Sequence, residues 1–199
     1  MTADPLSAKV PPTGFPLDPR IAARWSPRGF DGSHQLSRSE VGSLLEAARW
    51  AASASNAQPW RFIVTLRGSE DFELVTASLI GSNAEWAPRA SALIVACART
   101  VDVEGRALRW AAYDLGQSVA WLTAQAESMG LSVHQCGGFD PEAITRDFDL
   151  GADIEPMAVV VVGRFDEHAP LPDRLREREA APRERMSLED LVLRGWPLA

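Results

Sequence analysis

The sequence is poor in cysteine, and it contains no long apolar run. Its two cysteines, Cys97 and Cys136, are spaced neither as metal ligands nor as a redox CxxC pair. This favours a reducing, cytoplasmic setting. No stretch approaches the ~20 apolar residues of a membrane-spanning helix, and the first residues lack the apolar centre of a signal peptide. We therefore expect a cytoplasmic protein that does not bind membranes.

Lysine is also scarce, because Lys9 is the only one in 199 residues. Arginine carries nearly all of the positive charge, and the formal net charge is -7. An acidic chain lacks the basic surface that nucleic acids and anionic membranes attract. Arginine clusters still indicate where a phosphate could bind, since the planar guanidinium group matches phosphate oxygens.

Several catalytic motifs are missing. The sequence contains no GxGxxG, GxxxxGK[ST], HExxH or GxSxG pattern. His34, His134 and His168 do not share the spacing of metal ligands. The chemistry of an enzyme with this sequence would therefore come from a bound organic cofactor.

Apolar periodicity predicts alternating helices and strands. Strands are expected over residues 60–66, 91–99, 131–135 and 156–163. Helices are expected from Ser37 to about residues 53–56, over 71–79 and 104–129, after Asp140 and from Ser187. The helix over 104–129 is apolar on more than one side, which indicates the centre of the core or a subunit interface. This order predicts a sheet with helices on its faces, of the α/β or α+β class.

Three segments carry the candidate site residues. In RWSPRGF (24–30), Arg24, Ser26 and Arg28 could bind one anion, or the arginines could make surface ion pairs. In AASASNAQPWRF (51–62), small residues beside Asn56 and Gln58 could admit a flat ligand, or Asn56 could cap a helix. In QCGGFD (135–140), a glycine pair precedes a helix and could offer backbone N–H groups to a ligand, or form a plain tight turn.

Together these segments, with the patterns RxSxR, SxxNxQPWxF and GGFD, resemble the nitroreductase family of flavoenzymes over about residues 24–192. The resemblance implies an α+β sandwich with a central, mostly antiparallel sheet flanked by helices and a long core helix. It also implies an intertwined homodimer with shared active sites. Residues 1–20 would be an N-terminal arm and 21–199 the domain that binds flavin mononucleotide (FMN), with 164–186 an extended arm that crosses the dimer and has no core of its own.

The resemblance also assigns roles. Arg24, Ser26 and Arg28 would bind the phosphate, ribityl chain and pyrimidine edge of FMN. Ser53 and Asn56 would come from the partner subunit, and Asn83, or else Ser82, would lie near the polar edge of the ring. The full set of implied cofactor-binding residues is Arg24, Trp25, Ser26, Arg28, Ala52, Ser53, Ala54, Asn56, Gln58, Asn83, Gly137, Gly138, Arg183 and Arg185. Ala52 departs from the family, which often has proline there.

The implied activity requires no catalytic side chain. NADH or NADPH would pass a hydride to flavin N5, and the reduced flavin would then serve a nitroaromatic, a quinone or a similar conjugated small molecule by ping-pong kinetics. Two alternatives remain open. One is a specialised flavoenzyme of the same family that dehalogenates, dehydrogenates or fragments flavin. The other is a flavin-binding protein without turnover.

Overall fold

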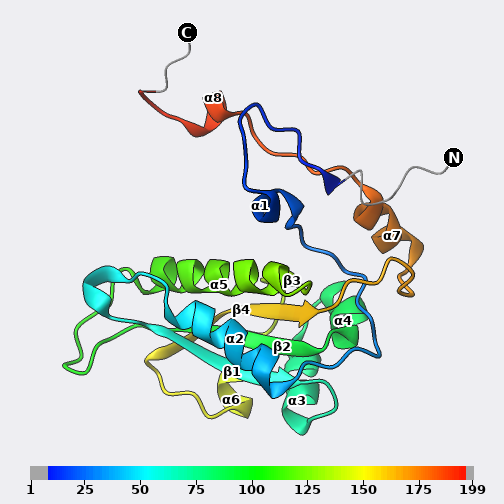
Figure 1. Cartoon of the computed structure of the whole chain (residues 1–199). Helices are drawn as coiled ribbons and strands as arrows, with labels where there is room; N and C mark the ends of the chain where they lie inside the picture. The colour runs from blue at the N-terminus through cyan, green and yellow to red at the C-terminus, as the bar shows by residue number, and fades with distance from the viewer. Residues whose placement is uncertain (1–8, 196–199) are drawn as a thin grey trace, which may run out of the picture.

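The structure is a computed structural model, and it describes residues 9–195. Four antiparallel strands form one sheet in the order β1-β2-β4-β3 (Figure 1). The strands are β1 (Trp60–Leu66), β2 (Ala92–Arg99), β3 (Ser132–Cys136) and β4 (Ile154–Gly163). This mixed helical and antiparallel architecture confirms the predicted fold class.

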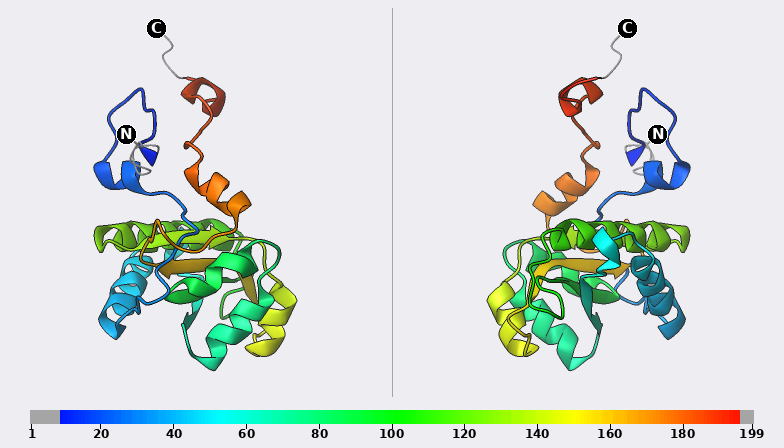
Figure 2. Two further views of the ribbon diagram at one scale, coloured as in Figure 1. Left: turned by 90° about the vertical axis from the view of Figure 1, so that its right-hand side faces the viewer. Right: turned by 90° about the vertical axis from the view of Figure 1, so that its left-hand side faces the viewer.

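Helices cover both faces of the sheet (Figure 2). The long helix α5 packs with α2 on one face, and α3 packs with α6 on the other. The helices are α1 (Pro19–Ala23), α2 (Arg38–Arg49), α3 (Glu70–Ser78), α4 (Asn83–Trp86), α5 (Ala111–Ser128), α6 (Pro141–Asp147), α7 (Asp173–Ala180) and α8 (Leu188–Leu191), with short 3-10 turns η2 (Ala54–Asn56) and η3 (Ala87–Arg89). Within residues 9–195 no helix is both long and apolar enough to cross a bilayer.

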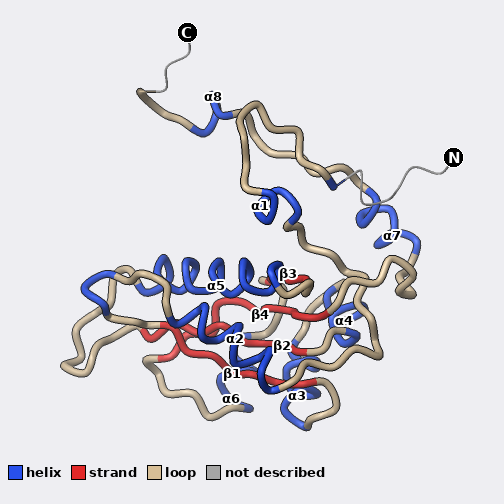
Figure 3. Tube along the Cα trace, viewed as in Figure 1, coloured by secondary structure: helices blue, strands red, loops and turns tan. Residues whose placement is uncertain are grey.

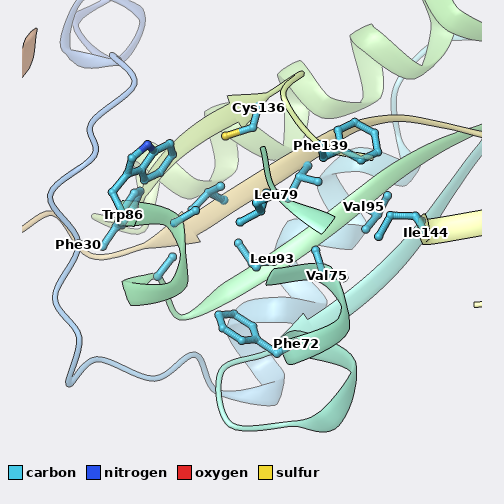
Figure 4. Packing of buried hydrophobic residues seen from close by; sticks show 14 of the residues in the cluster. Phe30, Phe72, Val75, Leu79, Trp86, Leu93, Val95, Cys136, Phe139 and Ile144 are labelled. Atoms are coloured by element: carbon cyan, nitrogen blue, oxygen red, sulfur yellow. The ribbon is translucent and has the colours of Figure 1, made fainter. Parts of the chain in front are cut away.

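The central strand β2 is apolar on both faces because both are covered. Leu93 and Val95 belong to the cluster under α3 and α6, which Figure 4 shows. Ile94 and the alanines Ala92 and Ala96 belong to the cluster under α2 and α5. Successive side chains of a strand point to opposite faces, so an uninterrupted apolar run is typical of a strand buried on both sides.

Two helix boundaries differ from the sequence prediction. α5 begins at Ala111 rather than near residue 104. The preceding residues form a turn in which Gly105 has a φ of 79° and Asp102 accepts backbone hydrogen bonds at 2.8 and 2.9 Å. α2 ends at Arg49, before the predicted 53–56. In the first case, local hydrogen bonds to an aspartate carboxylate compete with the helix.

Both ends of the described chain extend away from the sheet (Figure 3). The expectation that residues 164–186 have no core was wrong for their first half. Ala169, Leu171 and Leu175 are buried, and the last two join the core cluster under α3 and α6. In the sequence these apolar residues are isolated among charged ones, so they do not form a pattern that indicates burial.

Candidate functional site

A cavity of about 660 Å³ opens between α1, the second half of α5 and β3. Ile21, Trp121 and Val133 give it apolar walls, and Arg24 and Glu127 bring opposite charges to it. Its volume falls in the range of roughly 300–1,000 Å³ that is typical of small-molecule and cofactor pockets. The cavity is therefore a candidate ligand site.

Arg24 and Glu127 line this cavity, and Arg183 and Arg185 lie within electrostatic reach of Arg24. Burial lowers the pKa of Arg24; Glu127 opposes this decrease and Arg185 adds to it. Burial also lowers the pKa of Arg183, together with the charges of Arg24 and Arg185. Burial raises the pKa of Glu127, while Arg24 and Arg183 oppose that increase. Arg24 and Arg183 interact with the Glu127 carboxylate, and Arg185 adds a third positive charge beside them, so the excess positive charge suits a phosphate group.

The segment from Arg24 onward is held by hydrogen bonds. Arg24 Nη1 donates to Ser26 Oγ at 3.2 Å, and both residues line the cavity. The backbone N–H groups of Arg28 and Gly29 donate to the Glu179 carboxylate of α7 at 3.0 Å. Arg28 Nη1 lies 3.8 Å from the same carboxylate. The structure therefore engages Arg28 in an ion pair within the protomer.

Two further residues of the predicted set make contacts outside the cavity. The ring of Trp25 packs edge-on against Phe165, with centroids 5.3 Å apart. Arg183 Nη1 donates to the carbonyl oxygen of Lys9 at 2.8 Å and to that of Ala22. These bonds hold the C-terminal arm next to the N-terminal segment.

The glycine pair forms the turn between β3 and α6. The carbonyl oxygen of Gly138 accepts from Ile80 N–H at 3.0 Å and from Asn83 Nδ2 at 3.1 Å. A Cβ on Gly138 would lie only 2.8 Å from Asn83 Nδ2, so a side chain at this position would displace the Asn83 amide. Gly137 is exposed. Asn83 and Ser82 were the alternatives for a residue near the polar edge of the flavin ring. Asn83 contacts the glycine turn, whereas Ser82 precedes α4 and does not cap it through its side chain.

His134 lies on β3 between Pro27 and Trp86. Its Nδ1 is 2.8 Å from the carbonyl oxygen of Pro27, and its ring centroid is 4.4 Å from that of Trp86. Because a carbonyl oxygen only accepts, Nδ1 carries the hydrogen of the neutral ring. Burial lowers the pKa of His134 to about 4, although the Pro27 hydrogen bond opposes the decrease. His134 is therefore neutral at pH 7 and fixes the backbone at Pro27.

This burial predicts a loss of stability in acid. The unfolded chain binds the His134 proton below its ordinary pKa of 6.5, and the folded chain binds it only near 4. Stability should therefore fall as the pH decreases from 6.5 to 4, with about 2 kcal/mol lost between pH 7 and pH 5. Denaturant unfolding at the two pH values measures this. His134→Gln keeps a donor for Pro27 but does not titrate, so an equal loss in that variant would contradict the assignment.

The loop from Ser53 to Gln58 combines exposure with an unusual backbone. Three of its non-glycine residues are left-handed, with φ of 51° at Ser55, 56° at Asn56 and 47° at Gln58. Gln58 N–H donates to Ser53 Oγ at 3.0 Å, and Ala54 N–H donates to the buried Asp114 of α5 at 3.0 Å. Exposed side chains in this region are those of Ala52, Ala54, Ser55, Asn56, Ala57 and Gln58. Clustered left-handed residues are typical of functional sites.

The predicted site residues thus include two groups near opposite ends of α5 (Figure 1). The loop at Ala54 is bound to Asp114 in the first turn, and the arginine cluster lies near Glu127 in the last. With a rise of 1.5 Å per residue, these two positions on the helix are about 20 Å apart. One protomer does not bring the two groups together.

Sequence reasoning missed Asp114 and Glu127. Asp114 lies between Ala111 and Leu115 on the buried face of α5, and a carboxylate at such a position signals a partner elsewhere. Glu127 gave no such signal, because a glutamate near a helix end is ordinarily exposed. In the described part of the chain, no group of three or more His, Cys, Asp or Glu side chains could hold a metal ion.

Comparison with known proteins adds independent information. A solved structure described as an oxidoreductase containing FMN superposes with a TM-score of 0.86 and 35% identity, covering 94% of this chain and 95% of that one. An uncharacterized 15.4 kDa protein of Mycolicibacterium smegmatis is 37% identical over 142 residues, which span 68% of this chain and 95% of the relative. The major NAD(P)H-flavin oxidoreductase of Aliivibrio fischeri is 39% identical over 49 residues, 25% of this chain and 22% of that protein.

The nitroreductase family model matches residues 21–80. This range contains the arginine segment and the whole Ser53–Gln58 loop, two of the three segments that suggested the family from sequence. The fold agrees over nearly the full length of a solved relative at 35% identity. This chain belongs to the nitroreductase family.

Proposed function

We propose that this protein is an FMN-dependent oxidoreductase that takes electrons from NADH or NADPH and passes them to a nitroaromatic, a quinone or a similar conjugated acceptor. The observation that carries the proposal is the excess of positive charge beside the cavity, where Arg24 and Glu127 line the wall and Arg183 and Arg185 interact with Arg24, in an otherwise acidic protein. The similar FMN-containing oxidoreductase supports the cofactor. The short match to an NAD(P)H-flavin oxidoreductase supports the electron donor.

The residues present fit FMN at its charged end. Arg24 and Ser26 line the cavity, and Arg183 and Arg185 lie within electrostatic reach of Arg24. Guanidinium groups bind phosphate by strong, charge-assisted hydrogen bonds. The glycine turn with Asn83 would hold the heterocyclic end, because Gly137 is exposed and the space beside its backbone is open.

The separation of the two groups along α5 supports a dimer with shared sites. We propose that Ser53 and Asn56 reach the cofactor of a second copy, since their loop lies near the end of α5 opposite to the arginines of its own protomer. The outer face of α5 offers an interface, because Tyr113, Gly116 and Ala120 are exposed there. Obligate interfaces are apolar and often exceed about 2,000 Å².

The arm of residues 164–186 fits the same proposal. Beyond α7 it runs away from the sheet (Figure 1), Met186 is 64% exposed, and Leu188 and Leu191 of the following helix α8 are also exposed. We propose that this arm crosses to the second protomer. Exposed apolar residues on an extended segment are typical of an element that packs on a partner.

When bound, FMN would supply the redox chemistry, by accepting a hydride at N5 and delivering electrons to the acceptor. The protein's own side chains would bind and orient rather than react. His134 is neutral and engaged with Pro27. Burial raises the pKa of Cys97 to about 11 and that of Cys136 to about 12, which keeps both thiols protonated and unreactive. We place the protein in the cytoplasm, where its thiols stay reduced.

An absorbance spectrum followed by anaerobic addition of NADH or NADPH tests the proposed function. The purified protein, loaded with FMN if necessary, should show flavin absorption that bleaches on addition of the donor and returns with a quinone or a nitroaromatic. A protein that binds FMN but does not bleach would overturn the proposed electron transfer from NADH or NADPH, in favour of the specialised flavoenzyme or the non-catalytic flavin-binding protein. A protein that does not bind FMN at all would overturn the whole proposal.

A further inference from the structure

The only lysine of the chain, Lys9, is buried although it lies near the N-terminus. Its relative exposure is 8%, which is unusual because lysine side chains are ordinarily solvated. Burial lowers its pKa, while the nearby Glu179 opposes the decrease and Arg183 and Arg28 add to it. A charged group in such a position requires specific partners.

Lys9 contacts two separate segments. Its Nζ donates to the carbonyl oxygen of Ala181, just after α7, at 2.6 Å. The same ammonium group lies 4.6 Å from the ring centroid of Trp25, in cation–π geometry. Trp25 lies between Arg24 and Ser26, which line the cavity. Lys9 therefore joins the arginine-bearing segment to the part of the C-terminal arm that follows α7.

The backbone of Lys9 adds a third connection. Its carbonyl oxygen accepts from Arg183 Nη1 at 2.8 Å, and Arg183 also donates to the carbonyl oxygen of Ala22 in α1. Lys9 thus binds the C-terminal arm on both sides of Pro182, through its ammonium group at Ala181 and its carbonyl group at Arg183. Loss of the side chain would release one of these two attachments and free the arm to shift relative to Arg24.

We propose that Lys9 is a positioning residue that holds Arg183 and Arg185 next to Arg24, so that the three guanidinium groups form one phosphate site. The inference rests on the proposed binding of FMN. Lys9 itself would not contact the phosphate, because its ammonium group is enclosed by Ala181 and Trp25. Its effect should therefore be confined to ligands that carry a phosphate.

Binding of FMN and riboflavin to Lys9→Met tests this. Methionine preserves the length of the chain and removes the charge. The Kd for FMN should rise about tenfold, as expected for loss of an ordered charge-assisted contact, and the Kd for riboflavin, which lacks the phosphate, should stay unchanged. Arg178→Met is the matched control, because it removes one positive charge from an exposed position on α7; its FMN affinity should match the wild type.

The comparison of the two flavins separates the outcomes. If Lys9→Met weakened the binding of FMN and riboflavin equally, or weakened neither, the positioning role of Lys9 would be overturned while the proposed function would stay intact. A wild-type protein that binds neither flavin would overturn both. Lys9→Arg keeps the positive charge, so its Kd for FMN should lie between those of Lys9→Met and the wild type.

A second measurement uses the wild-type chain and does not depend on the folding of a variant. Reductive methylation modifies only Lys9 and the N-terminal amine, and peptide masses distinguish the two. If Lys9 holds the phosphate-binding arginines, bound FMN should slow the methylation of Lys9 at least severalfold, and bound riboflavin should not. Equal protection by both flavins, or by neither, would contradict the proposal.

Discussion

Replacing Arg24 by glutamine should weaken the binding of FMN by about 10- to 100-fold. Arg24 is the member of the arginine cluster that lines the cavity directly, and it shares a hydrogen bond with Ser26. A hydrogen bond to a charged group contributes roughly 1.5–3 kcal/mol, and each 1.4 kcal/mol is about tenfold in affinity. Titration of the apoprotein by flavin fluorescence measures the effect.

Riboflavin and a distant arginine supply the controls. Riboflavin has no phosphate, so its Kd should change little in Arg24→Gln. Arg38→Gln, at the exposed start of α2, should bind FMN like the wild type. If Arg24→Gln bound FMN with unchanged affinity, the phosphate would have to lie elsewhere, and the assignment of the cavity would fail.

Gly116→Arg should convert the protein into a monomer that does not retain FMN. Gly116 is exposed in the first half of α5, and in the described structure a Cβ built there meets no atom within 4 Å outside the helix's own neighbouring backbone. Within one protomer the change should even be favourable, because glycine in a helix interior costs about 1 kcal/mol relative to good helix formers. If α5 forms the interface, however, an arginine there would separate the two copies. Light scattering coupled to size exclusion reports the mass.

Ala77→Arg is the matched control for this prediction. Ala77 is an exposed helical position on α3, on the opposite face of the sheet. It should leave the mass and the flavin content unchanged. A Gly116→Arg protein that keeps the mass and flavin content of the wild type would show that the outer face of α5 is free, and the shared-site dimer would be wrong.

Local sequence pattern was sufficient to predict most of the fold. Strand β2 is continuous and apolar because helices cover both of its faces, and α5 carries an apolar seam along nearly its whole length. The start of α5 could not be predicted, because the Asp102 carboxylate accepts hydrogen bonds from the backbone and favours a turn where the apolar pattern is still helical. Apolar patterns report burial, and they do not report competing side-chain hydrogen bonds.

The site was only partly predictable for a different reason. The arginine and glycine segments stand out locally, but their partners lie far away in the chain. Glu179 binds the backbone at Arg28 across 151 positions, and Asp114 binds Ala54 across 60. No spacing rule connects such pairs. The three-dimensional structure was therefore needed to identify the ion pair of Arg28 and the hydrogen bond that anchors the loop at Ala54.

The loop from Ser53 to Gln58 has a fixed, left-handed backbone conformation that lowers the stability of the folded protein. Each non-glycine residue in this conformation costs on the order of 1 kcal/mol or more, and Ser55, Asn56 and Gln58 all adopt it. Burial elsewhere offsets this strain, with the adjoining Pro59 and Trp60 buried at the start of β1. Ser55→Gly would remove the strain at this position in the folded backbone. The same change would increase the mobility of the loop and of its exposed amide side chains. A substitution that relieves the backbone strain of this loop would therefore increase the stability of the protein and make the positions of the loop side chains less well defined.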